Sequence, residues 1–87
     1  MSVIVRLCVP LQRFTQGKEV VYQPAGSLRD IILRLHEEYP GLTDVLMSGD
    51  KLKDHFVLSI NDKIVDNLEE ILKDGDELSI VPLVIGG

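Results

Sequence analysis

Cysteine is nearly absent from this sequence of 87 residues, in which Cys8 stands alone. A single cysteine excludes an intramolecular disulfide, an all-cysteine metal site and an iron-sulfur cluster held by four cysteinates. Basic residues are also few, since nine Lys and Arg stand against 14 Asp and Glu and give a net charge of -5. Nucleic-acid binding normally needs a basic surface that neutralises phosphates, so the composition argues against that class of function.

Long apolar runs and glycine-rich loops are missing as well. The N-terminus lacks a basic region followed by a long apolar stretch, and the run Leu83-Val84-Ile85 near the C-terminus is far too short to span a membrane. No phosphate-binding glycine loop or catalytic constellation occurs, and His36 and His55 are too far apart in the sequence to suggest a metal site. We therefore expect a cytoplasmic protein that is not an enzyme, holds no metal and binds no cofactor.

The composition that remains is that of one globular domain. Hydrophobic residues make up 45% of the chain and charged residues 26%, which is too apolar for a disordered protein. A chain of this length can build a single core but not two. We expect one domain over residues 1–87, of which 83–87 form a C-terminal tail.

Periodicity predicts an α+β fold with one main helix. Residues 27–39 begin with Ser27 as a helix N-cap and Asp30 three positions later, and their apolar residues recur at helical spacing. Segments with strand composition lie at 3–9, 18–23, 56–60, 63–65 and 77–81, and Val9 is expected on the buried face of the first. A short helix is expected at 42–47 and a helical turn at 68–72, capped by Asn67. The order favours a mixed sheet of four to five strands, with the first and last strands parallel at its centre and the helix across one face.

The last fourteen residues are the most informative stretch. Asp74-Gly75-Asp76 predicts a tight turn before the final strand, and Pro82 is expected to end that strand because it has no N–H to donate. The five residues that follow can span about 17 Å when extended, so they can enter another protein's active site. Gly86 and Gly87 have no Cβ, which leaves the Gly87 carboxylate open to a partner.

These features resemble those of the ThiS/MoaD family of ubiquitin-like β-grasp sulfur carriers. The resemblance rests on Asp74-Gly75-Asp76-Glu77, Ile80-Val81-Pro82, Gly86-Gly87 and the Ile60-Asn61-Asp62 hairpin, within the predicted order of elements. It implies that an adenylyltransferase similar to ubiquitin-activating enzymes uses ATP and Mg to activate the carboxylate of Gly87. It implies further that a sulfur donor enzyme makes the thiocarboxylate, and that an acceptor synthase or a cysteine synthase receives the sulfur.

The resemblance also suggests which residues a partner contacts. The flexible tail that enters the partner's active site consists of Leu83, Val84, Ile85, Gly86 and Gly87. The sheet face away from the helix is the candidate docking surface, and alternation along the strands places Cys8 there too. The docking residues on this face are Arg6, Val57, Ser59, Ser79, Val81 and Pro82. An ordinary sheet surface without a partner is an equally good interpretation of this alternation.

Three functions and two pathways stay open at this stage. Residues 40–55 make the middle longer than in typical thiamine carriers, so the chain resembles either the small subunit of molybdopterin synthase or the carrier used in cysteine synthesis. Gly41-Leu42, Leu46-Met47 and Lys51-Leu52 favour the cysteine type. A ubiquitin-like modifier joined to lysine through Gly87 would use the same activated terminus. A plain β-grasp interaction module, in which Gly-Gly is incidental, is the third hypothesis.

Overall fold

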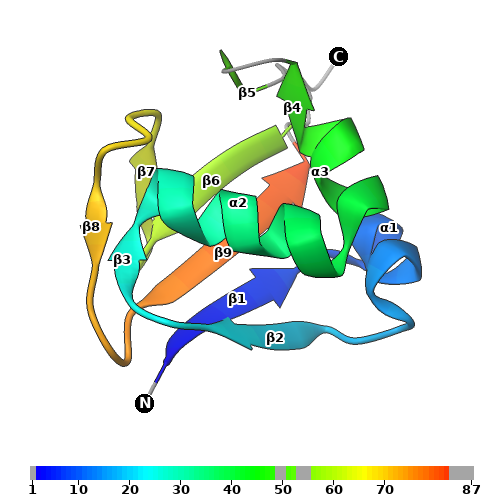
Figure 1. Cartoon of the computed structure of the whole chain (residues 1–87), viewed down its shortest axis with the longest axis horizontal. Coiled ribbons are helices and arrows are strands. Elements are labelled where there is room, and N and C mark those ends of the chain that lie inside the picture. The colour runs from blue at the N-terminus through cyan, green and yellow to red at the C-terminus, as the bar shows by residue number, and fades with distance from the viewer. Residues whose placement is uncertain (1, 49–50, 53–55, 83–87) are drawn as a thin grey trace.

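The computed structural model describes residues 2–48, 51–52 and 56–82. Its main sheet has five strands in the order β2-β1-β9-β6-β7 (Figure 1). The strands are β1 (Val3–Leu7), β2 (Val20–Gln23), β6 (Phe56–Ile60), β7 (Lys63–Val65) and β9 (Glu77–Pro82). The first and last strands, β1 and β9, are parallel and adjacent, while all other neighbours are antiparallel. The predicted mixed sheet and its parallel centre are confirmed.

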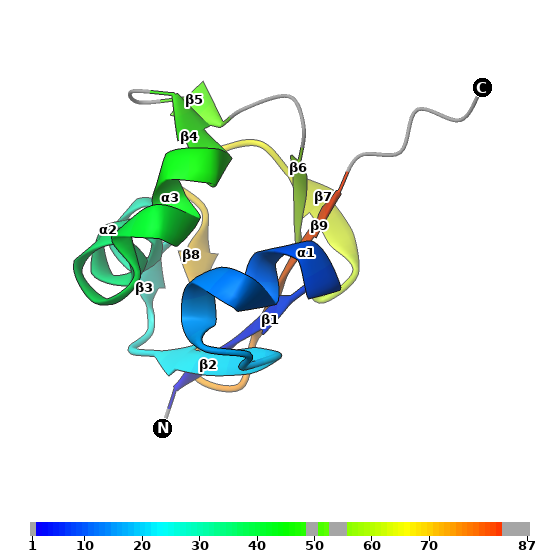
Figure 2. The same ribbon diagram turned by 90° about the vertical axis from the view of Figure 1, so that its right-hand side faces the viewer.

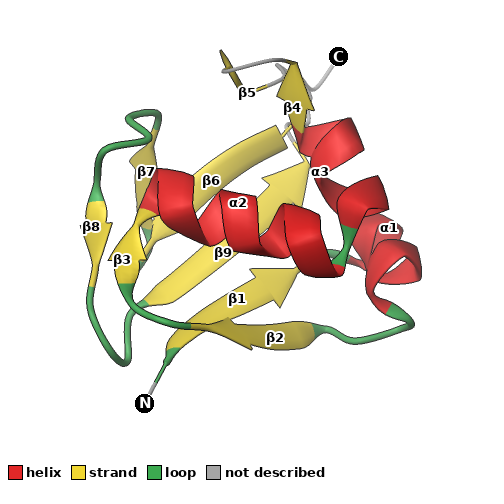
Figure 3. Cartoon of the chain, in the orientation of Figure 1, coloured by secondary structure: helices red, strands yellow, loops and turns green. Residues whose placement is uncertain are grey.

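One helix covers a face of this sheet, as predicted. The helix α2 (Leu28–Glu38) crosses the strands, and α3 (Pro40–Leu46) follows it directly (Figure 3). Apolar side chains of the helices and of one sheet face form a single buried core because each element can bury only its apolar side. Its fully buried members include Val3, Val5, Leu28, Ile31, Leu35, Leu42, Leu58, Leu78 and Ile80.

Two short antiparallel pairs stand apart from the main sheet. Strand β3 (Gly26–Ser27) pairs with β8 (Ile71–Leu72), and β4 (Met47–Ser48) pairs with β5 (Lys51–Leu52). The predicted short helix at 42–47 is present as α3, although it begins earlier, at Pro40. Among the described residues, the longest helix has 11 residues, and none is both long and apolar enough to cross a membrane.

The start of α2 confirms one prediction and corrects another. The backbone N–H of Asp30 donates to Ser27 Oγ at 3.1 Å, so Ser27 is the N-cap. The N–H groups of Leu28 and Arg29 donate to the carbonyl oxygens of Glu70 and Leu68, at 2.7 and 2.8 Å. The predicted helical turn at 68–72 is therefore wrong: this segment is a turn followed by β8, held extended by its bonds to α2 and β3. Non-local bonds have overridden the local preference.

The first strand is shorter than predicted. It ends at Leu7, and the chain turns into α1 (Val9–Gln12) and a 3₁₀ helix, η1 (Arg13–Thr15). Val9 is therefore not a core residue, and 77% of its surface is exposed, whereas Cys8 is partly buried against the core instead of facing outward. Pro10 explains the change, because a residue without an N–H and with a fixed φ suits the first turn of a helix.

Pro82 also differs from its prediction. It is the last residue of β9 and lies opposite Phe56 in the register with β6, so the strand includes it instead of ending before it. A proline is tolerated at a strand end, where its missing N–H costs little.

Candidate functional site

Strand β9 is the element that carries the chain toward its C-terminus. It lies between β1 and β6, and it is in register with β1 over Glu77 to Ile80 and with β6 over Leu78 to Pro82. Two hydrogen-bonded neighbours make this strand a fixed base for whatever follows Pro82 (Figure 2). The predicted tail residues lie outside the described residues; they are Leu83, Val84, Ile85, Gly86 and Gly87.

The turn before β9 is the one predicted from Asp74-Gly75-Asp76. Gly75 has φ of 90°, and its N–H donates to the carbonyl of Ser2 at 3.0 Å. The N–H of Asp76 donates to the carbonyl of Lys73 at 2.9 Å, while the N–H of Lys73 donates to Asp76 Oδ2 at 2.8 Å. The backbone bond from Lys73, followed by the side-chain bond from Asn61, lowers the pKa of Asp76 below its usual range.

Asn61 joins this turn to the neighbouring hairpin, a role that sequence reasoning missed. Its Nδ2 donates to Asp76 Oδ1 and its Oδ1 accepts from the N–H of Glu77, both at 3.0 Å. Its own N–H donates to the carbonyl of Glu77 at 2.9 Å, and its φ of 50° is left-handed. Asparagine tolerates that conformation, which signalled a turn, but the partner across the sheet could be found only once β6 and β9 were known to be adjacent.

The structure brings five of the six predicted docking residues together on one face of the sheet. Pro82, the sixth, alternates with Val81 and so falls on the same side of β9 as the buried Leu78 and Ile80. Arg6, Ser79 and Ser59 are neighbours in register across β1, β9 and β6, and Val57 lies opposite Val81. Arg6, Val81 and Pro82 are exposed, and the other three are partly buried. Since the alternating residues of these strands point into the core, the face lies opposite α2. Its role in docking remains a prediction.

Arg6 is engaged in ion pairs on this face. Its Nη2 lies 2.8 Å from Glu77 Oε1, and its Nη1 lies 3.4 Å from Glu19 Oε1. The hydrogen bond and the charge of Glu77, with a smaller contribution from Glu19, raise the pKa of Arg6 above its already high usual value. The guanidinium is therefore shared between two carboxylates, so the face does not present an isolated positive charge.

Two exposed apolar side chains on the same face were also missed. Tyr22 on β2 lies opposite Ile4, and Ile64 on β7 lies opposite Ser59. Both residues are in predicted strands, but alternation could not assign them to a face until the pairing was known. They extend the apolar surface to both edges of the sheet.

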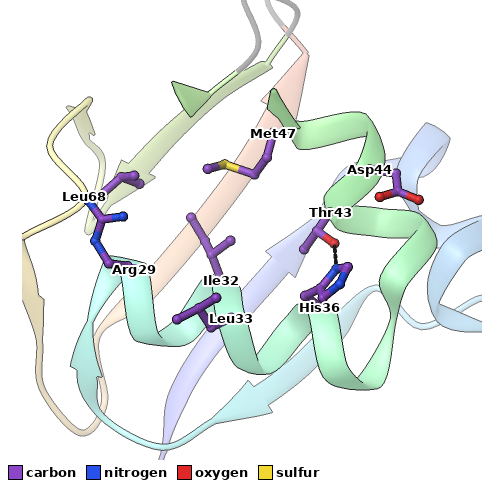
Figure 4. A pocket seen from close by; sticks show the side chains of 8 residues that line it. All are labelled: Arg29, Ile32, Leu33, His36, Thr43, Asp44, Met47 and Leu68. Atoms are coloured by element: carbon purple, nitrogen blue, oxygen red, sulfur yellow. Dashed lines mark hydrogen bonds between the residues drawn. The ribbon is translucent and has the colours of Figure 1, made fainter. Parts of the chain in front are cut away.

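A pocket of about 250 Å³ lies on the other side of the molecule, against α2 and α3 (Figure 4). Its lining residues are Arg29, Ile32, Leu33, His36, Thr43, Asp44, Met47 and Leu68. The Thr43 hydroxyl donates to the carbonyl of Pro40 at 3.1 Å, and His36 Nδ1 shares a hydrogen bond of 2.6 Å with Thr43 Oγ1. This contact joins the two helices.

Metal binding gains no support from the described part of the chain, in which no group of three or more His, Cys, Asp or Glu side chains is placed to hold an ion. Comparisons with known proteins identify a family for this chain. The ThiS family model matches residues 5–87, which is nearly the whole chain. A sequence comparison with curated proteins finds no match.

Solved structures support the family match. A chain of the BexX/CysO complex from Amycolatopsis orientalis is 30% identical, with a TM-score of 0.90 and coverage of 99% of this chain and 100% of that one. The small archaeal modifier protein 1 of Methanosarcina acetivorans is 30% identical, with a TM-score of 0.82 and coverage of 99% and 96%.

A third structure contains a different partner. A chain of the complex of subunits 1 and 2 of the molybdopterin-converting factor from Helicobacter pylori is 31% identical, with a TM-score of 0.67 and full coverage of both chains. Two of these three relatives are thus seen bound to another protein. Together with the five-stranded mixed sheet and its crossing helix, the match shows that this chain belongs to the ThiS family of β-grasp sulfur carriers, which are non-catalytic and bind no cofactor.

Proposed function

We propose that this carrier holds sulfur as a thiocarboxylate on Gly87. An adenylyltransferase similar to ubiquitin-activating enzymes uses MgATP to join AMP to the Gly87 carboxylate and releases pyrophosphate. The terminal sulfur of a persulfide on a sulfur donor enzyme then attacks the acyl carbon and AMP leaves, which gives an acyl disulfide. A thiol reductant cleaves the S–S bond of this disulfide, which releases the donor as its thiol and leaves the sulfur on Gly87 as a thiocarboxylate. The observation that carries the proposal is the family match, which extends through residue 87. Residue 87 follows a strand, β9, that is fixed between two neighbouring strands.

Elementary reactivity supports each step. A carboxylate is a poor electrophile until one of its oxygens becomes part of a good leaving group, which adenylation provides. The resulting thiocarboxylate sulfur is a nucleophile on a tether that can reach about 17 Å from Pro82. Gly86 and Gly87 leave the reacting carbon accessible because neither carries a Cβ.

We assign the partner contacts to two regions. Leu83, Val84 and Ile85 are held in the partner's channel, and the sheet face opposite α2 docks against the partner's surface. On that face the exposed Arg6 and Val81 lie among partly buried side chains, with Tyr22 and Ile64 farther out. A small apolar centre with polar neighbours is typical of protein interfaces. We expect the carrier to act in the cytoplasm, because adenylation needs ATP.

Among pathways, we favour sulfur transfer to a cysteine synthase over transfer within a molybdopterin synthase. The longer middle of the chain, now seen as α3 with the β4-β5 pair, is consistent with both types of carrier. The TM-score is 0.90 with the chain from the BexX/CysO complex and 0.67 with the chain from the molybdopterin-converting factor. The greater similarity to the first agrees with the preference drawn from residues 41–52.

A ubiquitin-like modifier is the second candidate. The likeness to a small archaeal modifier protein favours it, and the activated terminus would be the same. In that case the Gly87 carbonyl would end in an isopeptide bond to a lysine, with loss of the activating group. The two functions differ only in the nucleophile that attacks the activated carbonyl.

Removal of Gly86 and Gly87 tests the proposal. We expect the truncated chain to fold normally and to lose carrier-dependent exchange of pyrophosphate into ATP by the activating enzyme of the same cell. The readout is exchange rate against carrier concentration, and circular dichroism is the control for folding. Exchange that continues at the wild-type rate would rule out activation at Gly87 and leave the plain interaction module.

A further inference from the structure

The two ends of β9 differ in chemistry. The strand begins at Glu77, directly after the turn that contains Asp74 and Asp76, and it ends in the exposed Val81 and Pro82. Five steps of about 3.4 Å separate its first and last residues, so the acidic end lies about 17 Å from the origin of the tail. Carboxylates at the acidic end therefore lie away from the partner groups that meet the tail at Pro82.

Val9 is a further exposed apolar residue at the end of the sheet where β9 stops and the tail begins. Leu7 is the register partner of Ile80, and the N–H of Cys8 donates to the carbonyl of Ile80 at 3.3 Å. Val9 comes next and begins α1, which lies at the end of the sheet to which β1 and β9 both point (Figures 1 and 2). Val9 is 77% exposed and Val81 is 42% exposed. Val81 on β9 and Val9 at the start of α1 are thus both exposed at this end of the sheet.

The length of the tail determines what a partner must touch. Gly87 lies five residues beyond Pro82, so an active site that receives it lies within about 17 Å of Pro82. If that site is recessed by most of this length, the surface around its entrance comes against the residues beside Pro82. Three bulky apolar residues in the tail fit a recessed channel, because an open site would leave them in water.

From these observations we propose that Val9, Val81 and Pro82 form an apolar collar around the origin of the tail, and that the entrance rim of the activating enzyme's channel packs against it. This inference rests on the proposed function. It adds the chemistry of the surface that the activating enzyme presents to the carrier: an apolar, uncharged rim around a narrow channel. The collar extends the docking surface beyond the sheet onto α1. Val9 thereby becomes a specificity-determining residue that an extended first strand would have buried.

The substitution Val9→Asp tests the collar. An acidic residue at the first position of a helix is compatible with the helix dipole, so the fold should be retained. In pyrophosphate exchange by the cell's activating enzyme, we expect the KM for the carrier to rise about tenfold, because a charge replaces an apolar contact at the rim. The kcat should stay within about twofold, since the reacting carboxylate is unchanged. Thermal unfolding of the variant checks that the fold is intact.

Leu33→Asp is the matched control. Leu33 is 56% exposed on α2, on the side of the molecule opposite the docking face, and it belongs to neither the collar nor the tail. Its substitution introduces the same charge at another exposed aliphatic residue and should leave the KM unchanged. Equal KM values for Val9→Asp and wild type, or equal rises for both variants, would overturn the collar.

The remaining outcomes separate a failure of the collar from a failure of the proposed function. A KM that rises only in the later transfer of sulfur to the acceptor would assign Val9 to that partner and contradict the assignment to the activating enzyme. If the wild-type carrier supports no exchange at all, the proposed function fails and the collar fails with it. If the wild-type carrier supports exchange and the Val9→Asp variant supports it equally well, only the collar is rejected.

Discussion

At the scale of single residues, a cluster of polar groups fixes the start of β9. Asn61, Asp76 and Glu77 are joined by two side-chain bonds of 3.0 Å, and Asp76 also accepts from the N–H of Lys73. The cluster unites the β6-β7 hairpin with the strand that leads to the tail. The turn sequences at Asn61-Asp62 and Asp74-Gly75-Asp76 were predictable from local preference. Their mutual contact was not, because the two turns are 12 or more residues apart.

The lowered pKa of Asp76 makes stability depend on pH. Its carboxylate is stabilised in the fold, so this contribution is fully present above the usual value of 3.8 and is lost as the pH falls below 3.8 through the folded-state pKa. We expect the unfolding free energy of Asp76→Asn to fall less than that of wild type between pH 6 and pH 3. Urea unfolding at both pH values measures it, and equal losses in the two proteins would contradict the account.

At the scale of elements, those that local sequence signals define could be predicted, whereas those that depend on long-range contacts could not. The helix α2 was predictable because Ser27 caps it and apolar residues recur along it. Strand β8 was not, because it exists through pairing with β3 and through carbonyls that accept from the first N–H groups of α2. The early end of β1 lay between these cases: Pro10 carried the signal, but strand composition at Val9 obscured it.

Ser27→Ala tests the cap of α2. The variant loses the acceptor for the N–H of Asp30, which we expect to lower the unfolding free energy by about 1 kcal/mol. Ser27→Asp is the control, since its carboxylate can accept the same bond near the positive end of the helix and should keep most of the stability. Chemical denaturation compares the three proteins. An alanine variant as stable as wild type would mean that the bond contributes nothing.

At the scale of the whole molecule, the fold and the function occupy different parts of the chain. The buried core is drawn from residues 3–80, and the proposed chemistry takes place at residue 87. The family and the mixed sheet could be predicted from the sequence, because they follow from the order of elements and from the motifs at residues 60–62, 74–77, 80–82 and 86–87. Val9 at the tail end, Tyr22 and Ile64 could not be assigned without the register. The roles of the tail and of the docking face remain predictions.

The intact mass of the protein, isolated from its own cells without alkylating reagents, tests the central claim most directly. Replacement of one carboxylate oxygen by sulfur adds about 16 Da, and the account predicts this increase at Gly87. Tandem fragmentation must locate it, because oxidation of Met1, Met47 or Cys8 adds nearly the same mass. A terminus that stays unmodified even after incubation with MgATP, the activating enzyme and the sulfur donor would contradict sulfur carriage by this chain.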